Sequence, residues 1–63
     1  MEELVWVEQG GVWHTHFNGW LLKVYQFAGW NAKVSKEKTV RLTHELASME
    51  EAQVECLRLC KEQ

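Results

Sequence analysis

The fold of this chain is decided by one stretch, Val12-Trp13-His14-Thr15-His16-Phe17-Asn18-Gly19-Trp20-Leu21-Leu22-Lys23-Val24. Asn18-Gly19 separates two aromatic-rich runs of alternating residues, a pattern typical of two antiparallel strands joined by a two-residue turn. The turn sets the register of the strands, so Phe17 is expected to face Trp20. The register in turn assigns every side chain of the hairpin to one of two sheet faces.

The segments around this hairpin predict three more strands. Two glycines end an apolar run near the N-terminus, and Phe27-Ala28-Gly29 fits a three-residue loop after the hairpin. A loop of that length places Val24 opposite Ala32, whereas a two-residue loop would place Lys33 on the apolar face at a cost in stability. Together the patterns predict strands at about residues 3–8, 12–17, 20–26, 30–35 and 39–46.

The C-terminal segment predicts one helix at residues 49–61. Ser48 and Glu51 have the spacing of a capping box, in which side chains bond to free main-chain amides at the helix start. The apolar residues repeat at helical spacing and therefore share one side, while Val54 lies almost opposite. The apolar side consists of Met49, Ala52, Cys56, Leu59 and Cys60.

These elements predict a single domain, residues 1–63, with a two-layer α+β fold: an antiparallel β-meander of four to five strands packed on one C-terminal α-helix. The inner face, toward the helix, is expected to hold Trp13, Thr15, Phe17, Trp20, Leu22, Val24, Trp30, Ala32 and Val34, joined by Val40, Leu42 and Leu46. The outer face is expected to hold His14, His16, Leu21, Lys23, Tyr25, Asn31, Lys33, Arg41 and Thr43. The first strand has two registers open to it: a two-residue turn puts Trp6 inside, and a three-residue turn puts Val5 and Val7 inside.

The length of the chain limits what it can do. A domain of 63 residues has too thin a core to enclose a substrate cavity, so a non-enzymatic protein without catalytic residues is expected. No apolar run reaches the ~20 residues of a membrane-spanning helix, and the acidic start lacks the basic region of a signal peptide. Cys56 and Cys60 lie one helical turn apart, where a disulfide would constrain nothing, so reduced thiols and a cytoplasmic location are expected.

The basic middle of the chain falls on the expected outer face. The net charge is −2, yet residues 23–41 alone carry +4 and both flanks are acidic. Basic residues beside a tyrosine on an open sheet can recognise another protein, or the phosphates and bases of a nucleic acid. The candidate binding residues are His14, His16, Leu21, Lys23, Tyr25, Lys33 and Arg41.

Two pairs of potential zinc ligands occur, His14-x-His16 and Cys56-x-x-x-Cys60. The members of each pair share one side of their element, because strands repeat every two residues and helices about every four. The predicted register directs the histidines away from the helix and the cysteines toward the sheet. A joint site would require the sheet to invert, so no metal or other cofactor is expected.

Three motifs give the chain a resemblance to a group of known proteins. Trp13 to Trp20 has the form Trp-x-x-x-x-x-Gly-Trp, Gly29-Trp30 repeats Gly-Trp at a second turn, and Ser48 to Ala52 has the form Ser-x-Glu-Glu-Ala. This pattern resembles small proteins encoded by phages and prophages, although His44-Glu45 stands where such proteins carry a glycine. The resemblance implies a meander with a closing helix, and some such proteins resemble inhibitors of host defence systems.

We therefore expect a small non-enzymatic protein-binding module, acting as a phage-encoded inhibitor or adaptor on a host protein. The alternatives are a nucleic-acid-binding module that uses the basic outer face, and a structural component of a larger assembly.

A homodimer is also expected, because the strands at both sheet edges are unpaired on one side and can pair with another chain. The first edge, Leu4–Val7, carries no lysine or proline that would oppose such pairing. Leu21 and Tyr25 on the outer face offer a second surface for such a pair, where Lys23 and Lys33 would oppose it by repelling their symmetry mates.

Overall fold

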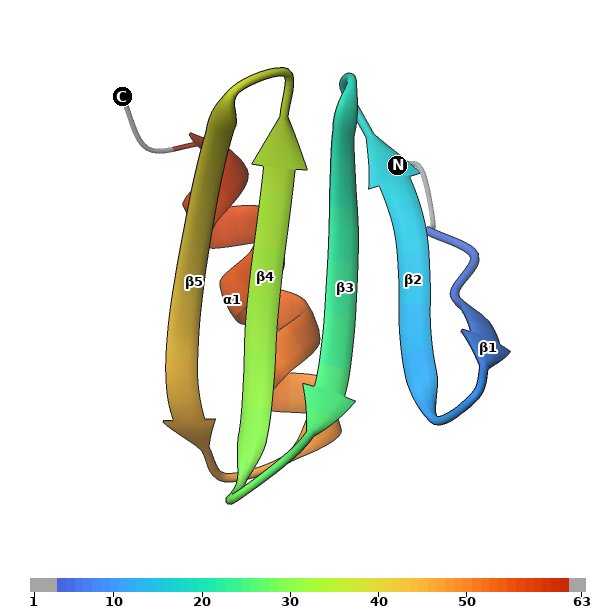
Figure 1. Cartoon of the computed structure of the whole chain (residues 1–63), viewed down its shortest axis with the longest axis vertical. Coiled ribbons are helices and arrows are strands. Elements are labelled where there is room, and N and C mark those ends of the chain that lie inside the picture. The colour runs from blue at the N-terminus through green and yellow to red at the C-terminus, as the bar shows by residue number, and fades with distance from the viewer. Residues whose placement is uncertain (1–3, 62–63) are drawn as a thin grey trace.

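The computed structural model describes residues 4–61. It contains a five-stranded antiparallel sheet in the order β1-β2-β3-β4-β5 and one C-terminal helix, which confirms the predicted α+β meander (Figure 1). The elements are β1 (Val7–Gln9), β2 (Val12–Phe17), β3 (Trp20–Gln26), β4 (Trp30–Lys36), β5 (Thr39–Leu46) and α1 (Met49–Lys61).

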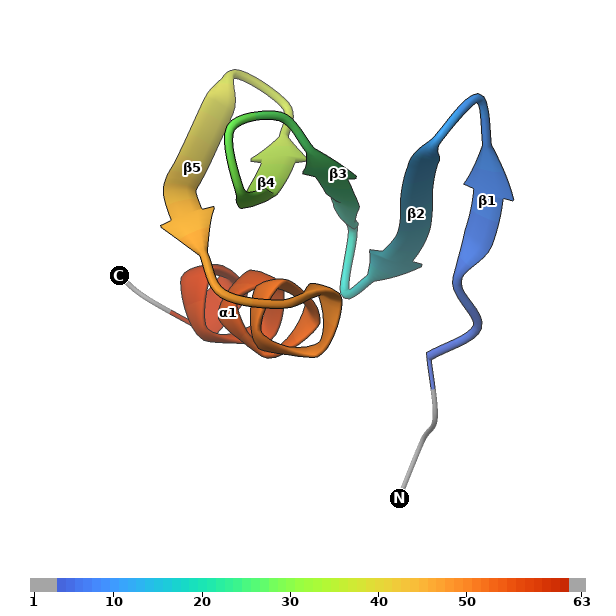
Figure 2. The ribbon, with the colours of Figure 1, turned by 90° about the horizontal axis from the view of Figure 1, so that it is seen from below.

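The helix covers one part of the sheet. α1 packs against β3, β4 and β5, while β1 and β2 continue the sheet beyond the helix (Figure 2). The buried core therefore lies between α1 and the last three strands. It consists of Trp20, Leu22, Val24, Ala32, Val34, Ala52, Cys56 and Leu59.

The two predicted turns set the register of the central strands as expected. Asn18 and Gly19 both have positive φ, 50° and 83°, and Phe17 pairs with Trp20. The three-residue loop at residues 27–29 pairs Val24 with Ala32, so that both side chains enter the core. Trp13 was expected in this core but is only half-buried, because β2 lies outside the cover of α1.

The first strand is shorter than predicted. It begins at Val7 rather than at residue 3, which lies outside the described residues. Gly10 and Gly11 form a two-residue turn, with φ of 61° and 84°, and pair Glu8 with Trp13. This register decides between the two open alternatives: the half-buried Trp6 packs against the core, and Val5 and Val7 are exposed.

The faces predicted for β5 are wrong over most of the strand. Val40 and Leu42 are 58% and 41% exposed, whereas Arg41 pairs with the core residue Val34. Thr43, also expected outside, pairs with Ala32 and turns inward. The two-residue turn after β4 causes this difference, because it pairs Lys36 with Thr39 and so turns the odd-numbered residues of β5 toward the helix.

A bulge near the end of β5 changes the alternation again. The register shifts between the pairs of Ala32 and Trp30, and Glu45 there adopts a positive φ of 59°. The extra residue returns Leu46 to the inner face, where it pairs with Trp30 and packs against the core. The prediction for Leu46 is therefore confirmed.

The helix begins as the sequence predicts. The Ser48 hydroxyl accepts a hydrogen bond from the Glu51 amide at 3.1 Å, and the Glu51 carboxylate accepts one from the Ala47 amide at 3.3 Å. Val54 is 66% exposed on the side opposite the sheet. Within residues 4–61, no helix has the length and apolar character required to cross a membrane.

Candidate functional site

The outer sheet face presents its side chains in rows that run across the strands, because paired residues of neighbouring strands share a face. The middle row consists of Val7, His14, Lys23, Lys33 and Leu42. The row beside it consists of His16, Leu21, Ser35 and Val40. These two rows lie on the sheet face opposite α1.

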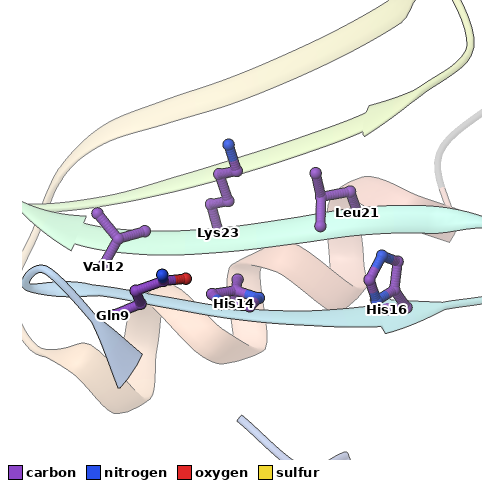
Figure 3. A pocket seen from close by; sticks show the side chains of 6 residues that line it. All are labelled: Gln9, Val12, His14, His16, Leu21 and Lys23. Atoms are coloured by element: carbon purple, nitrogen blue, oxygen red, sulfur yellow. The ribbon is translucent and has the colours of Figure 1, made fainter. Parts of the chain in front are cut away.

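A hollow of about 440 Å³ lies on this face (Figure 3). Its lining comes from β1, β2 and β3 and consists of Gln9, Val12, His14, His16, Leu21 and Lys23. The hollow brings together four of the predicted binding residues, namely His14, His16, Leu21 and Lys23. Sequence reasoning missed Val12, although its alternation with His14 and His16 in the hairpin places it on the outer face. It also missed Gln9, whose place in the hollow depends on the two-residue turn at Gly10-Gly11.

Two other predicted residues lie on the outer face outside the hollow. Tyr25 pairs with Val12, and Lys33 pairs with Lys23. Both Tyr25 and Lys33 are half-buried. They extend the candidate surface from the hollow toward β4.

The predicted placement of Arg41 on the outer face is wrong. Its guanidinium donates a hydrogen bond to the Leu59 carbonyl near the end of α1, and its charge lies 5.1 Å from the centroid of the Trp20 ring. A cation is favoured both at a helix C-terminus and over an aromatic ring. Arg41 therefore ties the sheet to the helix and is not part of the outer surface.

Asn31 was also expected on the outer face, yet it is only 2% exposed. Its side-chain amide donates hydrogen bonds to the carbonyls of Phe27 at 3.0 Å, Gly29 at 3.2 Å and Tyr25 at 3.4 Å. Its Oδ1 lies 3.0 Å from Nδ1 of His44, which must donate because an amide oxygen only accepts. Asn31 thus holds the β3–β4 loop against β5.

The charge of the outer rows is entirely basic. Lys23 and Lys33 are direct cross-strand neighbours, His14 stands beside Lys23, and neither row contains an acidic residue. Like charges directly opposite each other destabilise a sheet. An anionic group supplied by a partner would relieve this repulsion.

Glu55 and Thr43 form a polar contact on the inner side of the sheet. The Thr43 hydroxyl donates to Glu55 Oε2 at 2.7 Å, and Arg58 Nε donates to Glu55 Oε1 at 2.7 Å. The hydrogen bond from Arg58, more than any other contact, lowers the pKa of Glu55 to about 2, against the opposing effect of burial. These three residues join β5 to α1, so their contacts have a structural role.

The cysteines and histidines lie on opposite sides of the sheet, as predicted. The Cys56 thiol faces the inner side and donates a weak hydrogen bond to the Lys23 carbonyl at 3.6 Å. Burial raises the pKa of Cys56 to about 12 and also raises the pKa of Cys60, so both thiols stay protonated at neutral pH. Among the described residues, no group of three or more histidine, cysteine or acidic side chains could hold a metal ion.

Removal of metal ions is expected to leave the protein unchanged. Structural zinc contributes directly to folding, so its loss lowers the melting temperature. Because the two ligand pairs lie on opposite sheet faces, EDTA should not shift the melting curve followed by circular dichroism. A large fall in melting temperature that added zinc reverses would contradict this placement of the ligands.

Comparison of the chain with models of protein families, with curated proteins and with solved structures finds no match. The hollow has to be judged by its chemistry alone. The hollow combines the apolar side chains of Val12 and Leu21 with the polar groups of Gln9, His14, His16 and Lys23. Such a mixture suits noncovalent recognition of another molecule.

Proposed function

We propose that this chain is a small non-enzymatic protein-binding module that recognises its partner with the outer sheet face. The observation that carries the proposal is the hollow of about 440 Å³, in which His14 and Lys23 lie between the apolar side chains of Val12 and Leu21. Interfaces between proteins commonly combine apolar contact with hydrogen bonds from polar groups. The lysine pair beside the hollow favours a partner with an acidic group at this point.

The size of the sheet face is adequate for this role. A specific interface of standard size covers about 800 Å² on each partner. The described chain exposes 4629 Å² in total, so about a sixth of its surface would be sufficient. The hollow and the adjoining outer rows extend across all five strands.

The corrected faces of β5 favour a protein over a nucleic acid as the partner. Arg41 points inward, and the apolar Val40 and Leu42 take its place on the outer face. The outer rows thus keep only the two lysines as permanent cations. Binding to a phosphate backbone draws its affinity from many such cations.

We propose further that the module is a phage-encoded inhibitor or adaptor acting on a host protein in the cytoplasm. The support is its resemblance to small phage and prophage proteins in the Trp13–Trp20 hairpin, Gly29-Trp30 and Ser48–Ala52. The free thiols of Cys56 and Cys60 suit a reducing compartment.

An affinity capture experiment tests the binding face. The wild-type protein, K23E and the control V54D are immobilised and exposed to bacterial lysate with and without nuclease. Lys23 borders the hollow and Val54 is exposed on the far side of α1, so both variants change one exposed or half-exposed position. We expect wild type and V54D to retain the same protein in the presence of nuclease, and K23E to lose most of it.

Two outcomes would overturn the proposal. Equal retention by wild type and K23E would mean that the hollow is not the binding face. Retention that disappears on nuclease treatment, together with oligonucleotide binding that weakens steeply as salt rises, would indicate a nucleic-acid-binding module instead. Far-UV circular dichroism of all three proteins checks that they remain folded.

A further inference from the structure

We infer that the free edge of β5 pairs antiparallel with β5 of a second copy, so that two chains form one continuous sheet with a two-fold axis at Leu42. This surface is separate from the hollow, which β1, β2 and β3 line. β5 is the last strand of the sheet and has 8 residues, whereas the opposite edge strand, β1, has only 3. An unpaired strand of that length is a template for another strand.

The turn before β5 shows which main-chain groups the edge offers. In an antiparallel pair, residues alternate between those that bond to the opposite strand and those whose N–H and C=O point the other way. Lys36 and Thr39 flank a two-residue turn, and the main-chain hydrogen bonds that close the turn join these two residues. The alternation then directs the N–H and C=O groups of Val40 and Leu42 away from β4, toward the open edge.

The same two residues carry exposed apolar side chains. Val40 is 58% and Leu42 is 41% exposed, and both lie on the outer face. With the two-fold axis at Leu42, this residue faces its own copy and Val40 faces His44 of the second chain. Cross-strand contact would then cover apolar surface that the monomer leaves in water.

The charges along β5 select a second copy in antiparallel orientation. Lys36 at the end of β4 and Lys38 in the turn flank Glu37 and leave a net charge of +1 before β5. Glu45 lies near the end of β5, and Glu50 and Glu51 follow in the first turn of α1. Antiparallel pairing of two identical strands brings the basic end of each near the acidic end of the other. Parallel pairing would bring like charges together.

Inward-pointing charges and bulges often prevent an edge strand from pairing with another chain, but neither prevents it in β5. Arg41 is an inward-pointing charge, but its guanidinium is turned under its own sheet to the Leu59 carbonyl and the Trp20 ring. The bulge lies beyond the Ala32–Thr43 pair, so the register from Thr39 to Thr43 is regular and, of the residues at and around the axis, His44 alone lies at the bulge. The strand therefore keeps an uninterrupted segment that can pair.

The lysines of the outer face do not oppose this dimer. Lys33 lies on β4, and the two β4 strands would be three strand spacings apart, about 14 Å. This separation exceeds the screening length of about 8 Å at physiological salt. A dimer that stacked two outer faces would instead bring Lys23 and Lys33 of both copies together.

Analytical ultracentrifugation of the purified protein tests the inference. At tens of micromolar we expect the wild type to sediment as a species of twice 7.4 kDa. L42K places two like charges opposite each other on the two-fold axis and should weaken association at least tenfold. The control V54K introduces the same charge at a position that is 66% exposed on α1, and it should remain dimeric.

Hydrogen exchange gives a second measurement that needs no variant. The Val40 and Leu42 amides should exchange slowly in the dimer, and their exchange should accelerate on dilution to concentrations at which only monomer sediments. A wild type of 7.4 kDa at all concentrations would overturn the inference. A dimer that L42K leaves intact, or fast exchange of both amides in the dimer, would show that another surface pairs.

Discussion

Replacement of Trp20 by alanine is expected to lower the free energy of unfolding by about 3–5 kcal/mol and to leave the chain largely unfolded. Trp20 is 8% exposed and belongs to the core between β3 and α1. Arg41 and Lys36 place their charges 5.1 Å and 5.9 Å from the centroid of its ring. Loss of the ring removes apolar burial and both cation–π contacts from a domain too small to have much stability in reserve.

The matched control for this prediction is Trp13→Ala. Trp13 is the same residue type on the inner face, but it is only half-buried because β2 lies beyond the helix. Trp13→Ala should therefore lower the free energy of unfolding by clearly less than the alanine substitution of Trp20 does. Urea denaturation followed by far-UV circular dichroism compares the variants without relying on tryptophan fluorescence. A well-dispersed NMR spectrum of W20A, or a larger loss in W13A, would contradict the description of the core.

Replacement of Asn31 by alanine is expected to lower the free energy of unfolding by about 2 kcal/mol. The variant loses the hydrogen bonds that the Asn31 amide donates to Phe27, Gly29 and Tyr25, and the contact with His44. Water can replace some of these bonds, because Phe27 is 78% exposed, and this limits the cost. The β3–β4 loop should become mobile.

The contribution of the loop bonds can be separated from that of the histidine contact. His44→Ala removes only the partner of Asn31 Oδ1 and leaves the three donated bonds, so it should cost less than N31A. Thermal denaturation gives the stabilities, and amide exchange at residues 27–29 reports the loop. Equal stability of N31A and the wild type would mean that the loop does not depend on this side chain.

Local sequence was sufficient to predict most of the fold. Asn18-Gly19 and, in the loop at residues 27–29, Gly29 tolerate the positive φ that their turns require, and each turn sets the register of its hairpin. The helix start at Ser48 is equally local, because its cap lies within one turn. The predicted separation of His14 and His16 from the cysteines followed directly from the hairpin register.

The candidate site was predictable only in part. His14, His16, Leu21 and Lys23 were selected because the hairpin register gave them a common face. The hollow itself also needs β1, whose register was open between two turn lengths. Asn31 gave only a weak signal, a short polar side chain two residues after a tight loop. Its burial depends on how the loop meets His44 of β5.

The sequence by itself determined the elements, the two central hairpins and the residues that fill the core from β3, β4 and α1. The faces of β5 were decided by the two-residue turn that pairs Lys36 with Thr39, together with the tertiary contacts that hold Arg41 inside. Val40-Arg41-Leu42-Thr43 alternates equally well in either register, and its apolar members favour the inner face when the strand is considered alone. The opposite register is stable because the Leu59 carbonyl and the Trp20 ring accommodate the Arg41 charge, and these partners come from segments distant in sequence.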